Sequence, residues 1–306
     1  MRGRWILVVA VLVASALAAA LWKRPELGRL VDRRTARERY VDGLRSAGLG
    51  ETALVRDWLA AADDALRNPA GATLPLETDV RHSPAAPKAY GYRLRLQRGR
   101  LLRVELTVSG TAPAMVFIEL FPADESVSIA PVAVSDGVEP RLAHETERDG
   151  EYILRIQPEL LRGGEMRIGQ RTTASMTFPV SGRTSAAVKS FFLDPRDNNR
   201  RQHHGIDIFA PRDTPIVAAA DGVVTLVGTS ELGGNIVWVW DAARGQSHYY
   251  AHMSRQAVTA GTRVGAGEVL GYVGNTGNAK STPPHLHFGI YSRGEGPVNP
   301  LPFVKE

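Results

Sequence analysis

His203-His204-Gly205-Ile206-Asp207-Ile208 is the stretch of sequence that decides the interpretation of this chain. Successive side chains of a β-strand point to opposite faces, so a strand here would turn His203 and Asp207 to one side, with only a glycine between them. Ile206 and Ile208 would face the other side, toward a hydrophobic interior. The pattern predicts a strand that covers a core and carries chemistry on its outer face.

The segment His285-Leu286-His287 follows the same rule, with both imidazoles on one face and Leu286 on the other. If the two strands are neighbours, two histidines and one carboxylate can surround a metal ion. Three protein ligands with an open fourth position are typical of a catalytic zinc site. The chain contains no cysteine, so any metal must be held by His, Asp or Glu.

Three ordered segments resemble the signature motifs of the LytM/lysostaphin-type zinc endopeptidases, family M23. They are His203-x-Gly205-Ile206-Asp207, Tyr250-Ala251-His252-Met253-Ser254 and His285-Leu286-His287-Phe288. The likeness covers about residues 201–300. It includes the intervening stretches 214–219, 221–224 and 264–271 and the terminal Val298-Asn299-Pro300.

The resemblance implies that His203, Asp207 and His287 bind one Zn²⁺ and that His252 and His285 are the catalytic histidines. It also implies a two-layer antiparallel β fold with an open groove at the metal, and hydrolysis of peptide cross-links in bacterial peptidoglycan. Zinc would activate a water for attack on the peptide carbonyl, while the two catalytic histidines guide the proton and stabilise the tetrahedral intermediate. Either of them could be the general base.

Three positions depart from the family pattern: Asp213 and Pro283 stand where glycine is usual, and Gly289 replaces a frequent glutamate. None of them removes a ligand or a catalytic group, so they bear on groove shape and substrate preference. An alternative function is a catalytically silent LytM-like module that binds and activates cell-wall amidases. Such modules typically lack one or more ligands, whereas all five key positions are filled here.

Two further histidines have other expected places. His204 alternates out of the ligand face, which predicts a position behind the ligands or in solvent. His248 shares strand parity with His252, so it could line the same groove.

Short strands and frequent turns predict an all-β domain over residues 181–306, for which the resemblance implies a peptidase built as a two-layer antiparallel β-sandwich. A hairpin is expected over Ile216–Val227, turning at Asp221-Gly222. Ile236–Trp240 is expected to pair with Gln246–His252.

Residues 88–180 change to period two and predict a second β-sandwich module, which could position the peptidase, occlude its site or act as a spacer. Its clearest strand segments are Tyr90–Leu96, Leu101–Val108, Met115–Phe121 and Asp149–Gln157. Residues 24–87 predict a helical stalk or packing hairpin, broken at Gly48-Leu49-Gly50, and then a linker from Asn68 to Pro87. The predicted fold class is therefore mainly β.

Residues 1–23 read as a signal anchor or a signal peptide. Trp5 to Trp22 is apolar except for Ser15, and as a helix it would span about 27 Å, close to the hydrocarbon thickness of a membrane. An uncleaved helix predicts a protein anchored in the inner membrane and facing the periplasm. Cleavage near Ala18 predicts secretion into the periplasm.

Composition narrows the partners. The formal net charge is +5, and no basic stripe interleaved with aromatic residues suggests nucleic acid. The expected partners are a peptidoglycan peptide as substrate and a membrane through the N-terminal helix. The sequence identifies no envelope regulator.

Overall fold

The computed structural model describes residues 34–109, 115–123, 130–196 and 198–306, and most of their regular structure is β-strand. This confirms the mainly β prediction. The predicted membrane helix over Trp5–Trp22 lies outside the described residues. No helix within the described ranges is long and apolar enough to cross a membrane.

Two helices open the described chain, α3 (Ala36–Ser46) and α4 (Ala53–Arg67). A capping box between Thr35 and Glu38 begins α3, and the Thr52 side chain caps α4. The break between them falls at the predicted Gly-Leu-Gly segment. Trp58 is 1% exposed and its indole donates to the Pro158 carbonyl at 2.9 Å, so the helices form a packing hairpin against the strands that follow.

The middle of the chain forms two sheets around one core. The first has the order β1-β3-β8-β5-β6 and the second the order β2-β9-β4-β7. Leu94 and Leu154 from the first sheet and Leu102 and Ile168 from the second are all fully buried in the same cluster. The strands are β1 Ala70–Gly71, β2 Leu76–His82, β3 Tyr90–Leu96, β4 Arg100–Ser109, β5 Val116–Pro122, β6 Ala133–Val134, β7 Arg141–Glu145, β8 Gly150–Pro158 and β9 Gly164–Ala174.

The prediction of a linker over Asn68–Pro87 is wrong, because this segment contributes β1 and β2 to the two sheets. All seven residues of β2 pair with β9, from Leu76 opposite Gln170 to His82 opposite Gly164. The prolines of the segment fall outside the strands, whereas Gly71 lies in β1. Leu76–His82 alternates between less and more exposed residues, and its pairing with β9 fixes this short segment as a strand.

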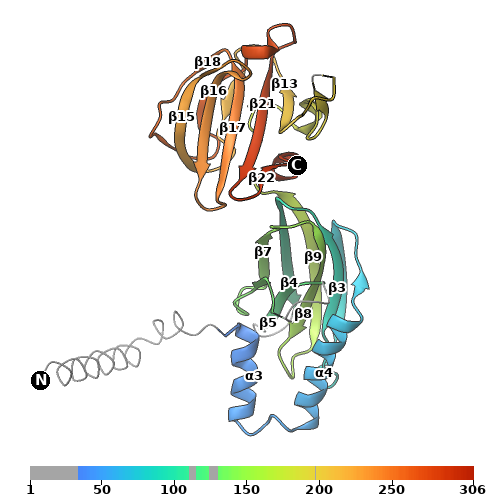
Figure 1. Cartoon of the computed structure of the whole chain (residues 1–306). Helices are drawn as coiled ribbons and strands as arrows, with labels where there is room; N and C mark the ends of the chain where they lie inside the picture. Colours follow the sequence, from blue (N-terminus) through green and yellow to red (C-terminus); the bar gives the residue numbers. More distant parts are fainter. Residues whose placement is uncertain (1–33, 110–114, 124–129, 197) are drawn as a thin grey trace, which may run out of the picture.

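The C-terminal domain is built on an eight-stranded sheet (Figure 1). Seven strands follow the order β10-β13-β21-β17-β16-β15-β19, and the eighth, β22, pairs with β21. A three-stranded sheet, β14-β20-β18, and a two-stranded pair, β11-β12, complete it. The helical segments described in this domain are three or four residues long. The elements are η1 Ser185–Ala187, β10 Val188–Ser190, β11 Pro195–Arg196, β12 Arg201–Gln202, β13 Ile206–Phe209, β14 Pro215–Val217, β15 Gly222–Ser230, β16 Gly234–Asp241, β17 Gln246–Met253, β18 Arg255–Gln256, β19 Arg263–Val264, β20 Val269–Tyr272, η2 Gly277–Ala279, β21 His285–Ser292, β22 Gly296–Val298 and α5 Leu301–Val304.

The predicted hairpin over Ile216–Val227 is wrong, whereas the predicted pairing of β16 with β17 is confirmed. β14 pairs with β20 in the smaller sheet, and β15 pairs with β16 in the larger one. Ala218 and Ala219 between them are fully buried, because the chain passes through the core from one sheet to the other there.

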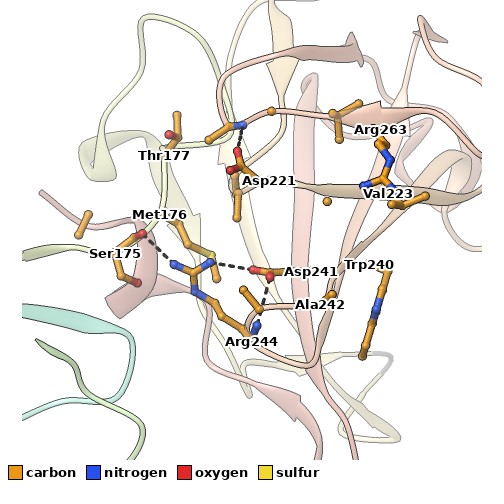
Figure 2. A pocket seen from close by; sticks show the side chains of 18 residues that line it. Ser175, Met176, Thr177, Asp221, Val223, Trp240, Asp241, Ala242, Arg244 and Arg263 are labelled. Carbon is orange, nitrogen blue, oxygen red and sulfur yellow. Dashed lines mark hydrogen bonds and ion pairs between the residues drawn. The ribbon is translucent and has the colours of Figure 1, made fainter. Parts of the chain in front are cut away.

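The end of the C-terminal domain opposite β18 meets the middle module through ion pairs (Figure 1). The Arg244 guanidinium donates to both carboxylate oxygens of Glu145 at 2.8–3.1 Å and to Asp241 at 2.8 Å. Arg98 donates to Glu295 at 2.6 Å. Figure 2 shows Arg244 and Asp241 lining a cavity of about 840 Å³ beside Ser175 and Met176.

Candidate metal centre

Three side chains from the sequence motifs converge at one point of the large sheet. His203 Nε2 lies 3.0 Å from Asp207 Oδ1 and 2.9 Å from His287 Nδ1, and the last two atoms are 3.0 Å apart. They form the His/Asp/Glu group in the described residues that could hold a metal ion. His203 is 2% exposed and Asp207 8% exposed, so water screens this triangle weakly.

Strand register brings two of the three residues together. β13 and β21 are antiparallel neighbours in which Asp207 pairs directly with His287. Ile206 and Ile208 are fully buried in the core on the other face, as the alternation predicts.

His203 departs from the predicted strand, because β13 begins only at Ile206. His203 lies instead in the irregular segment between β12 and β13, with its backbone N–H donating to the Asp194 carbonyl at 2.9 Å. The close approach of the His287 ring requires a glycine at position 205. A Cβ on Gly205 would lie 2.7–2.8 Å from the His287 ring, so the glycine makes room for a candidate ligand rather than for the ion itself.

Hydrogen bonding fixes the tautomer of His203. Its Nδ1 lies 2.8 Å from the Phe191 carbonyl oxygen, which can only accept, so in the neutral ring Nδ1 carries the proton and Nε2 is the nitrogen left to bind an ion. Burial acts to raise the pKa of Asp207, but its contacts with the His203 and His287 rings outweigh this and hold the pKa well below its usual range. Burial lowers the pKa of His287 as well.

This donor set fits a divalent cation. A nitrogen of each imidazole and a carboxylate oxygen lie within 3.0 Å of one another, so a single cation could contact all three. Nitrogen and carboxylate donors without thiolates are a set that Zn²⁺ accepts in catalytic sites.

The two predicted catalytic histidines lie beside this triangle. The His252 ring centroid is 5.0 Å from that of His285 and 6.0 Å from that of His287. His252 Nδ1 donates to the Thr276 carbonyl and His285 Nδ1 donates to the Pro283 carbonyl, both at 2.9 Å. Each ring therefore keeps an unprotonated Nε2 when neutral.

Burial, followed by the nearby His285 and His287, lowers the pKa of His252 to about 4. His252 is thus a neutral imidazole at neutral pH, able to accept a proton. Its backbone has φ 62°, in the left-handed region that non-glycine residues rarely adopt.

His248 was expected to be able to line the same groove as His252, and the backbone conformation of His252 explains why it does not. Strict alternation would turn 248, 250 and 252 to one face, and His248 and Tyr250 are indeed both fully buried in the core. The positive φ at His252 interrupts the alternation and turns its ring toward the metal centre. His248 therefore does not line the site, while His204 is exposed, one of its two expected places.

Sequence reasoning missed Arg196, which contacts a candidate ligand. Its guanidinium donates to Asp207 Oδ2 at 2.6 Å and to Ser190 Oγ at 2.5 Å. Ser190 Oγ in turn lies 3.3 Å from His203 Nδ1. The only signal available was a polar cluster shortly before the first histidine motif.

Comparison with known proteins supports the assignment of this domain. The model of peptidase family M23 matches residues 201–300. The DD-carboxypeptidase/endopeptidase Mpg of Neisseria meningitidis serogroup B is 46% identical over 101 residues, which are 33% of this chain and 22% of that protein. The L-Ala–D-Glu endopeptidase of Bacillus subtilis is 34% identical over 139 residues, 42% of each chain.

Among solved structures, the catalytic domain of lysostaphin from Staphylococcus simulans shares 30% identity, over 38% of this chain and 88% of that one, with a TM-score of 0.35. The chain spans less than half of the length of the two curated relatives named above. The family model covers residues 201–300, and these relatives match between 33% and 42% of this chain. The C-terminal domain of this chain belongs to peptidase family M23, in its LytM/lysostaphin type.

Proposed function

We propose that this protein is a zinc-dependent endopeptidase that hydrolyses peptide cross-links of bacterial peptidoglycan. The observation that carries the proposal is the mutual contact of His203, Asp207 and His287 within 3.0 Å, with His252 and His285 alongside. The family of the domain and the peptidoglycan endopeptidases among its relatives supply the substrate class.

In this proposal, His203 Nε2, Asp207 Oδ1 and His287 Nδ1 hold one Zn²⁺, which when bound supplies a Lewis acid for the peptide carbonyl and the attacking water. Phe191 orients His203 through its carbonyl, and Arg196 orients the Asp207 carboxylate. Such supporting contacts fix the direction of ligand lone pairs.

His252 and His285 act on protons and charge. Each ring is held by a backbone carbonyl at Nδ1, so its Nε2 is the atom that exchanges a proton with water or substrate. The low pKa of His252, about 4, favours it as the group that is neutral at the start of the reaction. After accepting a proton, either imidazolium can stabilise negative charge on the carbonyl oxygen.

The silent-module alternative is not favoured, because no metal-binding or catalytic position of the family pattern is missing here. The middle β module, which we propose to be a β-sandwich, would carry the peptidase at a fixed distance from its attachment. A cell-wall substrate requires the cell envelope as the location, and the apolar segment Trp5–Trp22 is the proposed anchor or export signal.

The proposal is tested by incubating the full-length protein with purified, cross-linked peptidoglycan and analysing the muropeptides by mass spectrometry, with and without a chelator. Cross-linked dimers should fall and monomers rise only when zinc is present. His203→Ala should abolish this conversion, while His204→Ala, at an exposed histidine next to the ligand, should preserve it. Zinc-loaded protein that leaves the dimers unchanged would refute the function.

A further inference from the structure

The open face of the eight-stranded sheet carries aromatic side chains beside the metal centre. Trp238 on β16 pairs directly with Tyr249 on β17, and Tyr291 follows on the neighbouring β21. These three side chains are half-buried and alternate with residues that are fully buried in the core: Val239, Tyr250 and Ile290. They therefore face away from the core, on the side of the sheet that carries Asp207 and His287.

These rings contact one another and reach the metal centre. The centroid of Trp238 is 4.5 Å from that of Tyr249 and 5.2 Å from that of Tyr291. Tyr249 meets the His287 ring edge-on at 5.7 Å. We call Trp238, Trp240, Tyr249 and Tyr291 the aromatic strip, which is continuous with the proposed active site.

The far end of the strip is positively charged. Trp240 pairs with Val223, which pairs with Arg263 on β19. These three residues also line the cavity that Met176 and Arg244 border (Figure 2). Arg263 is exposed and has no hydrogen-bond or ion-pair partner in the described part of the chain. None of the residues in these two cross-strand rows is acidic.

Gly289 keeps the strip open next to the ligands. This glycine pairs with Tyr249, and a Cβ on it would lie 3.1 Å from the Tyr291 ring and 2.9 Å from the His204 carbonyl. A long side chain at this position would cover the sheet between the metal centre and the rings. Because Gly289 has no side chain, Tyr249 and Tyr291 stay accessible side by side.

We propose that the aromatic strip binds the N-acetylated sugar rings of the glycan chain that carries the cross-link. The C–H bonds on one face of a pyranose are slightly positive and stack on the negative face of an aromatic ring. Trp238, Tyr249 and Tyr291 pack against one another at 4.5–5.2 Å, so a sugar ring would stack on the outer surface of this cluster. Arg263, together with the tyrosine hydroxyls and indole N–H groups, would donate to hydroxyl and acetamido oxygens. This inference rests on the proposed function.

A bound peptide explains the strip less well. Stem peptides of the cell wall carry methyl, carboxylate and amino groups, and none of these fills an extended aromatic surface. Flat rings with polar tips suit a sugar chain.

Binding is measured without any hydrolysis, by titrating the full-length protein with tetra-N-acetylchitotetraose and following tryptophan emission and the heat of binding. Saturable binding is expected, weakened about tenfold or more in Trp238→Ala or Trp240→Ala, which is the loss expected when a stacked ring is removed. Tyr272→Ala removes an aromatic ring from the other sheet of the domain and should leave binding unchanged. Arg263→Gln, at an exposed residue that should not affect folding, is a second probe and should weaken binding.

Hydrolysis adds an independent comparison between cross-linked dimers with and without their disaccharides. The rate for the glycan-bearing dimer should exceed that for the sugar-free dimer, and this ratio should fall toward one in Trp240→Ala. A wild-type protein that binds no chitotetraose, or variants that bind it as wild type does, would overturn the sugar proposal while cross-link cleavage stands. Equal losses on both dimers would point to peptide binding and also overturn it. If neither dimer is cleaved, the proposed function fails, and the titration still decides whether the strip binds sugar.

Discussion

Gly205→Ala is the smallest change that should disable the metal centre. The added Cβ would lie 2.7 Å from His287 Cε1, 2.8 Å from His287 Nε2 and 2.5 Å from the Phe288 carbonyl oxygen. The φ of Gly205 is not in the left-handed region, so alanine can adopt the backbone conformation. The effect is therefore steric and is directed at a candidate ligand.

The size of the effect follows from these distances. Ordinary contact begins at 3.4 Å, so the His287 ring must retreat by 0.6–0.7 Å. The Phe288 backbone cannot move as easily, because Phe288 pairs with Ile206 and both are fully buried. A misplacement approaching 1 Å costs up to about 10²-fold in rate. Overpacking of this kind costs about 1–3 kcal/mol of stability.

The assay measures bound zinc by mass spectrometry, muropeptide conversion and thermal unfolding on the same preparation. Gly205→Ala should stay folded, bind zinc about 10–100-fold more weakly and lose about 10²-fold in rate. Gly228→Ala is the matched control, since its Cβ would find its nearest atom at 3.6 Å. Wild-type zinc affinity and rate in Gly205→Ala would refute the steric reasoning and the ligand assignment of His287.

Three other outcomes are expected. Asp207→Ala should lose zinc and cross-link cleavage together, measured by metal analysis and muropeptide digestion. His285→Ala should keep zinc yet lose about 10²–10⁴-fold in turnover, because it removes an acid/base group. A fully active His285→Ala variant would contradict the role of His285 as an acid/base group. His248→Leu should reduce the loss of folding stability that the wild-type protein shows as the pH falls. Burial lowers the pKa of His248 from 6.5 to about 4, so its contribution is full above 6.5 and is lost as pH falls toward 4, a loss of about 3 kcal/mol. Urea unfolding of the chelated protein against pH measures this loss, and equal slopes in both proteins would contradict it.

The strand pair at the metal centre could be predicted because its signal is local. The alternation in Ile206-Asp207-Ile208 and in His285-Leu286-His287 sets which side chains leave the core, and the structure pairs these strands. The same reasoning predicted β16 and β17, where two apolar runs are joined by a short turn. In each case the residues that decide the conformation lie within the segment itself.

What could not be predicted depends on contacts between distant segments. β2 becomes a strand by pairing with β9, more than eighty residues later. β14 leaves β15 because its partner is β20 across the core. Arg196 reaches Asp207 from a separate pair of strands. Sequence patterns describe faces of single elements and carry little information about such partners.

The conformation of His252 shows why a candidate catalytic residue can break the rule that found the others. Tyr250, two residues earlier, is fully buried, and its hydroxyl oxygen accepts the Ala219 N–H at 2.9 Å. A regular strand that turns Tyr250 into the core would turn His252 into the core too. The φ of 62° at His252 instead goes with a ring that lies beside His285 and His287, at a cost of about 1–3 kcal/mol.

Neighbouring hydrogen bonds hold that conformation in place. The His252 N–H donates to the Gly233 carbonyl at 2.7 Å, and its Nδ1 donates to the Thr276 carbonyl at 2.9 Å. Two loops from outside β17 thus fix both the backbone and the ring. An outlier held so firmly beside the candidate metal-binding triangle is best explained by a requirement for an imidazole there, because a regular strand with a core-facing residue at 252 would be cheaper for folding alone.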